Sequence, residues 1–259
     1  RESKRPDQAR PLFERALRID EEIYGREHVV VAEDLEHLAS VCEPREAGPL
    51  LLRAVEIRRK TGPPLQLAEA LAKLGSIAPP DRAVPWLREA LDIRGKEAAG
   101  SDVASSTLLN DLGLALREVD AAESEKCFRR ALAIQEKLLG AKHPETGTTL
   151  NNLASLLLAT NRVAEAEVAQ KRALSILEST LGEDHARVAV AWSNLGDVLR
   201  AKGQLQAAEK CYRRALAIDE RLYGAAHPEV LADVEKLAGL LDDRGARREA
   251  AALRERLQR

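Results

Sequence analysis

Apolar residues recur at every third or fourth position along most of the chain, with polar residues between them. Because an α-helix has about 3.6 residues per turn, this spacing gathers the apolar side chains into one stripe along a helix. Residues 150–157 and 166–177 each carry such a stripe. The first stripe consists of Leu150, Leu153, Ala154 and Leu157. The pattern therefore predicts a pair of amphipathic helices.

The helical pattern repeats at a fixed interval in the second half of the chain. The sequence Phe-Arg-Arg-Ala-Leu at 128–132 returns 42 residues later at 170–174, with Gln and Lys in its first two positions. It returns again after a further 42 residues, as Tyr-Arg-Arg-Ala-Leu at 212–216. A fixed period of this length is typical of a stacked array of repeats, in which each unit buries its apolar face against its neighbours.

Two recurrent marks divide each repeat into two helices. A Leu-Ala or Leu-Gly pair marks the first helix, at Leu38, Leu74, Leu112, Leu153, Leu195 and Leu237. An alanine marks the second, at Ala16, Ala54, Ala90, Ala131, Ala173 and Ala215. We expect a left-handed residue to turn the chain between the two helices of a pair, at Asn161, Gly203 and Gly245. We also expect Ala166, Ala208 and Ala250 to lie close against Ala154, Gly196 and Ala238.

The N-terminal half departs from the regular spacing. From Leu38 to Ala54 the interval is 16 residues, whereas from Leu153 to Ala173 it is 20. Because four residues are about one helical turn, the apolar faces keep their orientation. Prolines in the shortened turns should end the first helix early, at Pro44, Pro79 and Pro80. We expect an irregular superhelix before residue 100.

The two ends of the chain differ from each other. Residues 7–24 resemble the second helix of a pair whose first helix is missing, which suggests an array truncated at its N-terminus. Its stripe is Leu12, Phe13, Ala16, Leu17 and Ile19. Exposure of this stripe should drive self-association unless a further helix covers it. The sequence thus predicts one repeat domain over 1–259: an orphan helix 7–24, irregular short repeats 29–97, regular repeats 102–244 and a polar capping helix 247–258.

These motifs resemble the tetratricopeptide repeat. The Leu-Asn-Asn-Leu-Ala sequence at 150–154 and the Gly-x-x-His-Pro sequence at 140–144 are similar to the 42-residue variant found in kinesin light chains and many bacterial proteins. The usual repeat has about 34 residues, and the additional eight lengthen its helices. The resemblance implies an all-α, right-handed superhelical solenoid of antiparallel helix pairs, with about six repeats and the orphan N-terminal helix.

Composition and charge narrow the range of partners. The formal net charge is −2, so no excess of basic residues favours nucleic acid, and we expect none as a partner. The longest apolar run, residues 188–192, is far shorter than the roughly 20 residues of a membrane helix, so no membrane association is expected. Three scattered cysteines favour buried thiols in a reducing compartment, and we expect a cytoplasmic, bacterial protein.

No motif predicts catalysis or a cofactor. The chain contains no phosphate-binding glycine loop, no CxxC and no HExxH sequence. Four histidines recur at equivalent loop positions: His28, His143, His185 and His227. Equivalent places in successive repeats are about 10 Å apart, too far to share one metal ion. We therefore expect these histidines to satisfy backbone groups where helices begin, and expect no catalytic residue, cofactor or metal site.

The inner face of the first helices carries the candidate binding residues. Asparagine is a poor helix former, so its presence at matched mid-helix places needs a reason. An amide offers donors and an acceptor that suit a peptide backbone, and first-helix asparagines bind cargo peptides in the kinesin light chains that these repeats resemble. Hydrogen bonding between neighbouring helices explains them equally well. The candidates for binding are Asn110, Asn151, Asn152, Ser155, Asn194, Asp197, Arg200 and His37.

The sequence supports two functions. The first is a non-catalytic module that binds a peptide or partner segment in the concave groove of the repeats. The second is a C-terminal sensor or regulatory arm of a larger signalling protein, such as a nucleotide-switch (STAND-type) ATPase. Acidic residues near both ends of the groove predict a partner with basic flanks. These residues are Glu33, Glu36, Glu69, Glu235, Asp242 and Asp243.

Overall fold

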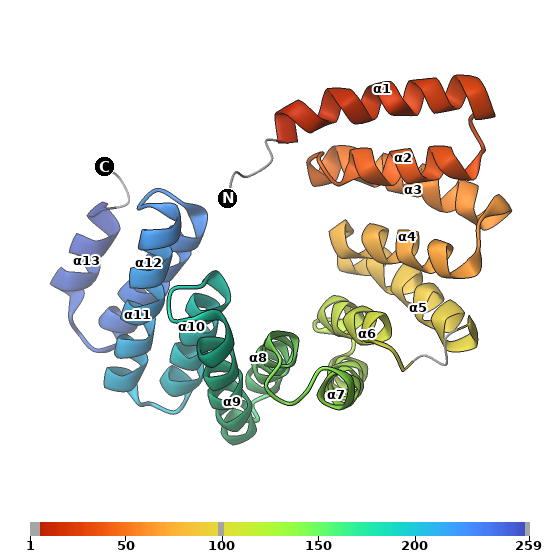
Figure 1. The fold of residues 1–259 in the computed structure, drawn as a ribbon. Coiled ribbons are helices and arrows are strands. Elements are labelled where there is room, and N and C mark those ends of the chain that lie inside the picture. The colour runs from red at the N-terminus through yellow and green to blue at the C-terminus, as the bar shows by residue number, and fades with distance from the viewer. Residues whose placement is uncertain (1–5, 98–100, 257–259) are drawn as a thin grey trace. The chain divides into compact units, whose positions relative to one another are not determined.

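The computed structural model describes residues 6–97 and 101–256, which form helices joined by turns (Figure 1). The thirteen helices in these residues are α1 Pro6–Tyr24, α2 Val29–Ala39, α3 Pro44–Thr61, α4 Pro64–Ile77, α5 Pro80–Glu97, α6 Val103–Leu116, α7 Ala121–Leu138, α8 Pro144–Ala159, α9 Val163–Leu181, α10 Ala186–Ala201, α11 Leu205–Tyr223, α12 Pro228–Asp243 and α13 Arg247–Arg256. The prediction of an all-α stack of helix pairs is confirmed.

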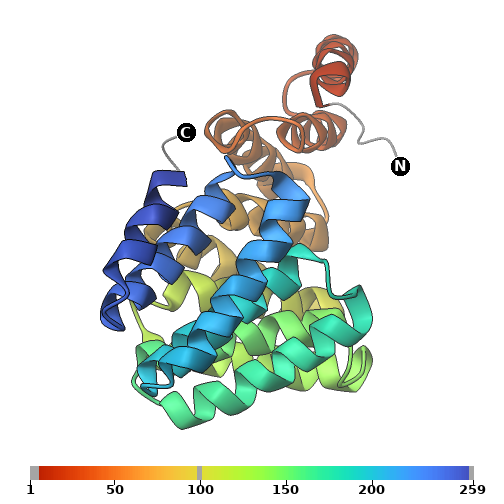
Figure 2. The same cartoon turned by 90° about the vertical axis from the view of Figure 1, so that its left-hand side faces the viewer.

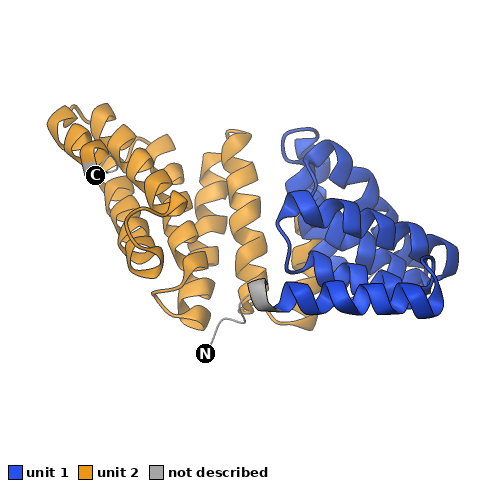
Figure 3. Cartoon of the chain, turned by 90° about the horizontal axis from the view of Figure 1, so that it is seen from above, with its two compact units in different colours: residues 1–127 blue, residues 128–259 orange. Residues whose placement is uncertain are grey.

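The chain divides into two compact units within α7, residues 1–127 and residues 128–259 (Figure 3). In the first unit, α2 packs on α3 and α4 packs on α5. In the second unit, the pairs are α8 with α9, α10 with α11, and α12 with α13. Figure 2 shows these layers, in which the helices of the second unit, coloured green to blue, lie side by side. Within each unit, successive helices cover one another's apolar stripes.

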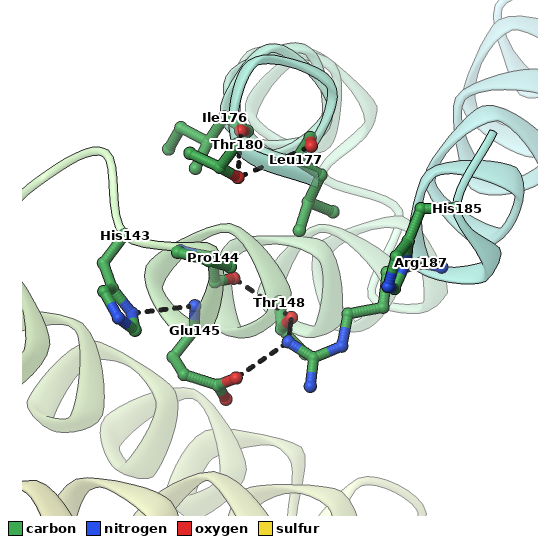
Figure 4. Close-up of polar contacts among 9 residues, drawn as sticks. All are labelled: His143, Pro144, Glu145, Thr148, Ile176, Leu177, Thr180, His185 and Arg187. Atoms are coloured by element: carbon green, nitrogen blue, oxygen red, sulfur yellow. Dashed lines mark hydrogen bonds and ion pairs between the residues drawn. The ribbon is translucent and has the colours of Figure 1, made fainter. Parts of the chain in front are cut away.

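Histidines open four of the first helices. His28, His143, His185 and His227 are the N-cap residues of α2, α8, α10 and α12, and each side chain accepts a hydrogen bond from the backbone N–H two residues later. Figure 4 shows the Nδ1 atom of His143 accepting from the amide of Glu145 at 3.2 Å. Because the first N–H groups of a helix have no partner inside it, such a cap stabilises the helix start. The prediction for these histidines is confirmed.

The connections between helices also follow the sequence. Asn161, Gly203 and Gly245 have φ angles of 60°, 74° and 79°, in the left-handed region expected for the turns inside each pair. The predicted early stops in the shortened repeats are confirmed. Helix α2 ends at Ala39 and α4 at Ile77, and prolines begin the helices that follow them, at Pro44 and Pro80. Proline suits this first turn because its missing N–H would have no partner there.

Gly196 lies in close contact with the second helix of its pair. A Cβ atom on Gly196 would lie 2.5 Å from the Cε1 atom of Tyr212, so the tyrosine ring occupies the space beside this glycine. Ala208, four residues earlier on α11, is fully buried in the same core cluster. Gly75 has the same relation to Leu87, at 2.7 Å. At these two positions the glycine leaves room for a large side chain from the second helix.

We expect Gly196→Ala to lower the free energy of unfolding by about 1–3 kcal/mol, because the added methyl group overlaps a ring that is itself buried. Gly239→Ala is the matched control, since the nearest atom to its Cβ position is the Nη1 atom of Arg200 at 3.8 Å. The control should gain up to about 1 kcal/mol from helix propensity. Urea unfolding followed by circular dichroism measures both, and equal effects from the two substitutions would contradict this account.

Helix α1 buries only part of its predicted stripe. Leu17 packs against Val31, Ala32 and Leu35, and the Phe13 ring stacks on His37 with centroids 5.7 Å apart. Leu12 and Ile19 remain 68% and 44% exposed, and Ile23 is 64% exposed. Ile218, at the place in α11 that matches Ile19, is fully buried. An apolar edge of α1 is therefore uncovered. At the other end, α13 is helical to Arg256, and the rest of the predicted helix 247–258 lies outside the described residues.

Candidate functional site

The first helices of the second unit carry a continuous polar surface, which we call the polar face. Side chains four and seven residues apart on α8 lie on one side of that helix, and the matching positions of α10 extend the surface. The polar face consists of Thr148, Asn152, Ser155, Asn194, Asp197, Arg200 and Lys236, all of which are half-buried. The polar atoms of such residues are held by the helices yet remain accessible.

Asn151 braces three helices beneath this surface. Its Oδ1 atom accepts hydrogen bonds from the Nε2 atom of Gln170 at 2.9 Å and from the Nδ2 atom of Asn194 at 3.0 Å. Gln170 also donates to the carbonyl of Ala191 at 2.8 Å. Asn151 and Gln170 are buried, so these bonds replace the hydrogen bonds to water that the two amides lose on folding. Asn151 is therefore a structural residue that ties α8 to α9 and α10.

Asp197 is the centre of a second network. Its Oδ1 atom accepts from the hydroxyl of Tyr212 and its Oδ2 atom accepts from the Nζ atom of Lys236, both at 2.7 Å. Lys236 also donates to the Oγ atom of Ser193 at 3.0 Å. Burial, together with the bond to Asp197, raises the pKa of Tyr212, so the hydroxyl keeps its proton and donates it to the carboxylate. The network fixes α10 against α11 and α12.

Ion pairs link the ends of neighbouring first helices. Arg200 on α10 donates through Nε to the Oδ2 atom of Asp243 on α12 at 2.8 Å. At the opposite end, Arg187 on α10 donates to Glu145 at 2.7 Å and to the Oγ1 atom of Thr148 at 3.4 Å (Figure 4). These pairs are partly exposed, so each contributes at most about 1 kcal/mol to stability. These ion pairs position side chains along the polar face, and rearranging them costs little energy.

The first unit places the two remaining candidates separately. His37 is exposed on α2 and lines a cavity of about 380 Å³ with Lys73 and Cys42. Asn110 lies on α6, where its Nδ2 atom is 3.4 Å from the Oδ1 atom of Asp111. Successive helices of the first unit pack on one another, and the α4–α5 pair lies between α2 and α6 in this succession. The structure therefore does not bring His37 and Asn110 into one site.

The structure contradicts the prediction of acidic groove ends at Glu36 and pairs three of the other acidic residues with arginines. Glu36 is buried, and its Oε1 atom accepts from the Nε atom of Arg58 at 2.5 Å while Oε2 accepts from Lys73. In the second unit, Asp243 pairs with Arg200, and Arg254 holds the other two carboxylates, those of Glu235 and Asp242. These basic partners offset part of the negative charge that was expected to select a partner with basic flanks.

The sequence reasoning missed Gln170 and Tyr212. Both stand at the position that Phe128 occupies in the preceding second helix, and all three are fully buried. A glutamine at a buried aromatic position requires hydrogen-bond partners, and that requirement is readable from the aligned repeats. The identity of the partners, Asn151 and the Ala191 carbonyl, depends on how the helices pack.

No helix in the described part of the chain combines the length and the apolar character needed to cross a membrane. Among residues 6–97 and 101–256, His, Cys, Asp and Glu side chains form no group of three or more that could hold a metal ion.

Comparison with known proteins places the chain among helical repeat proteins. BtubC (BKLC) from P. vanneervenii has a TM-score of 0.69 at 22% identity, over 87% of this chain and 95% of that one. A putative kinesin light chain repeat protein from Podosopora anserina has a TM-score of 0.59 at 24% identity, over 79% and 94%. A Rap protein complexed with Competence and Sporulation Factor has a TM-score of 0.61 at 15% identity, over 100% and 87%. Identities this low establish the shared fold alone.

No curated protein sequence matches the chain. The family model described as Tetratricopeptide repeat matches residues 105–179 and 187–257, together more than half of the 259 residues. These matched segments contain all of the polar face and both of its networks. The antiparallel helix pairs, the histidine caps and this match lead to one conclusion: the chain belongs to the tetratricopeptide repeat family.

Proposed function

We propose that this protein is a non-catalytic interaction module that binds an extended peptide or partner segment along the polar face of α8, α10 and α12. The observation that carries the proposal is the pair of networks centred on Asn151 and Asp197, which hold the first helices in place under half-exposed polar side chains. Rigid positioning lowers the entropy lost on binding, so the same contacts give higher affinity.

The residue types suit a peptide backbone. The Asn152 amide offers two donors and an acceptor, and Ser155 lies three residues further along the same side of α8. Asn194 commits one N–H to Asn151, and the rest of its amide extends the surface onto α10. An extended peptide rises about 3.3 Å per residue, so three or four residues span the distance of about 10 Å between packed helices.

One structural relative is consistent with this use of the fold. The Rap protein with the same fold was solved in complex with Competence and Sporulation Factor, so a stack of this kind can hold a separate molecule. We propose the same general role here, in the cytoplasm. The alternative role is a C-terminal sensor or regulatory arm of a larger signalling protein, for which the uncovered edge of α1 offers a contact surface.

Replacing Asn152 and Asn194 together by alanine tests the proposal. Peptides are first selected from a random display library on the wild-type protein and then titrated calorimetrically against both proteins. We expect the double variant to bind them about 5- to 150-fold more weakly, since unpaired peptide groups cost about 1–3 kcal/mol. Loss of the bond from Asn194 to Asn151 should cost only about 1 kcal/mol of stability.

Gln206→Ala, an exposed change on the second helix α11, is the matched control and should leave the affinity unchanged. Asn152→Ala alone keeps the hydrogen bonds that Asn151 makes to Gln170 and Asn194, so it tests the polar face with this network intact. Selected peptides that bind all variants equally would exclude the polar face as the binding surface.

We also propose self-association through the uncovered edge of α1, formed by Leu12, Ile19 and Ile23. Packing of two such helices would bury these side chains, each contributing up to about 1.5–3 kcal/mol when fully buried. Analytical ultracentrifugation should show a concentration-dependent dimer that is lost in the Leu12→Lys/Ile23→Lys variant. The control Val168→Lys changes another exposed apolar residue, on α9, and should dimerise like the wild type. A monomeric wild type at high concentration would refute this proposal.

A further inference from the structure

A cavity of about 640 Å³ lies in the second unit on the side of α8 that faces away from the polar face. We call it the outer slot. Its floor is Leu150, Leu153 and Leu157 of α8, and its walls are the second helices α7 and α9. Because Leu150 and Asn152 are two residues apart, their side chains point about 200° apart around the helix. The outer slot and the polar face are therefore separate surfaces.

The slot is apolar inside and charged at its rim. Leu132, Val168 and Ala169 extend the apolar floor onto the walls. Arg172 on α9 reaches across to the Oε1 atom of Glu136 on α7 at 2.6 Å. Both side chains of this pair are more than one-third exposed, so the pair is weak and can rearrange. A cavity of this size, with an apolar interior and charged groups at its rim, has the character of a ligand site.

The next repeat shows what fills the same position. Trp192 on α10 stands 42 residues after Leu150, and Glu178 on α9 stands 42 residues after Glu136. The indole Nε1 of Trp192 donates to the Oε1 atom of Glu178 at 3.0 Å, and its ring packs against the core cluster of the second unit. The cavity on that layer is lined by residues of α9 and of the turn after it: Lys171, Leu174, Ser175, Glu178, Ser179 and Glu183. The indole thus stands, on that layer, where the outer slot lies beside the buried Leu150.

We propose that the outer slot binds a tryptophan side chain of a partner protein, with its ring over Leu150 and its indole N–H donated to Glu136. Trp192 and Glu178 supply the geometry, since they are an internal example of the same ring on the same framework. An aromatic ring is a large apolar surface with a polar edge, which matches an apolar floor beside one carboxylate. Glu136 retains acceptor capacity while it is paired, because an ionised carboxylate has about four lone-pair sites.

The proposal is tested by counting the sites that bind a tryptophan probe in three proteins: the wild type, Leu150→Trp and Trp192→Leu. N-acetyltryptophanamide is the probe, and two-dimensional amide NMR of the full chain reports where it binds. The wild type should show one site, with shifts centred on the slot residues. Leu150→Trp should show none and should melt several degrees higher, because its own indole fills the slot. Trp192→Leu should show a second site, on the next layer.

The hydrogen bond to Glu136 is tested with a second probe. Glu136→Ala should bind N-acetyltryptophanamide about tenfold more weakly, whereas N-acetylphenylalaninamide, which has no ring N–H, should bind the variant and the wild type alike. Failure of the wild type to bind the tryptophan probe at millimolar concentration would overturn the proposal. Equal binding by the wild type and Leu150→Trp would also overturn it, even if Trp192→Leu proved too unstable to use. Substitutions in the polar face should leave all these results unchanged. The proposal for the outer slot is therefore tested independently of the proposal for the polar face.

Discussion

Replacing Glu36 by alanine should lower the free energy of unfolding by about 3–5 kcal/mol, the largest effect we expect from any single substitution. Glu36 is 7% exposed and Arg58 is 5% exposed, and their Oε1 and Nε atoms are 2.5 Å apart. The guanidinium of Arg58 also donates to the side chain of Gln66. Without Glu36, a buried cation would be left with one neutral partner, and the cost of its dehydration would no longer be offset by an opposite charge.

The matched control is Glu46→Ala, which removes an ion pair of the same unit at the surface. The Oε2 atom of Glu46 lies 2.8 Å from the Nη1 atom of Arg10, and both side chains are more than 40% exposed. The control should cost less than about 1 kcal/mol. Urea unfolding followed by circular dichroism measures both. The double change Glu36→Leu/Arg58→Met should recover most of the loss, since it removes both charges together. A small loss in Glu36→Ala, equal to that of the control, would show that solvent reaches the pair.

Replacing Asp233 by asparagine should stabilise the protein above pH 6 by about 2–3 kcal/mol. Asp233 on α12 is buried, and burial raises the pKa of its carboxyl to about 6, with the charge of Asp219 on α11 acting in the same direction. Ser193 on α10 and Lys236 partly oppose the shift, and Glu229 adds to it. Burial likewise raises the pKa of Asp219. Two buried carboxylates at one interface are least costly when one carries a proton.

The direction of the pH effect follows from the raised pKa. Between about pH 4 and pH 6 the folded protein holds a proton on Asp233 that the unfolded chain has lost, so the free energy of unfolding falls as the pH rises through this window. The asparagine side chain of the Asp233→Asn variant cannot ionise. The free energy of unfolding of this variant should therefore decrease less than that of the wild type as the pH rises. Melting temperatures at about pH 4.5 and about pH 7.5, measured for both proteins, report the difference.

Asp34→Asn is the comparison for this experiment. Asp34 on α2 and Asp20 on α1 occupy the positions that match Asp233 and Asp219, and burial with a hydrogen bond to Asp20 raises the pKa of Asp34 to about 6. Because the pKa of Asp34 is raised to about the same value, its substitution should change the pH dependence by a similar amount. An Asp233→Asn variant that keeps the full pH dependence of the wild type would show that other groups control it.

The sequence predicted the candidate site less well than the fold. The eight candidate residues are all polar and all lie on first helices, but packing assigns them different roles. Asn151 is buried and braces three helices, whereas Asn152, the next residue, lies half-exposed on the polar face. A rotation of about 100° per residue separates their side chains. Periodicity fixes that difference, but only the neighbouring helices decide which side chain meets Gln170.

Charge was similarly misjudged from the sequence. Glu36 was expected to be an acidic surface group, and in the structure it is an ion-pair partner inside the first unit. Arg58 and Lys73, its two partners, are 22 and 37 residues away in the chain. Formal charge counts such a group as if it were free in water, and a contact over that sequence distance cannot be seen without the packing.

The sequence by itself determined the local structure of this protein. Apolar spacing specified the helices, and Asn161, Gly203 and Gly245 specified the turns inside the pairs, because backbone angles and helical stripes depend on residues within a few positions of one another. Only the tertiary structure decided which side chains brace the repeats, that Tyr212 packs into the space beside Gly196, and that a cavity lies beside Leu150 where Trp192 stands in the next repeat. Those outcomes depend on how each helix is rotated against its neighbours, where the volumes of side chains far apart in the sequence must fit together.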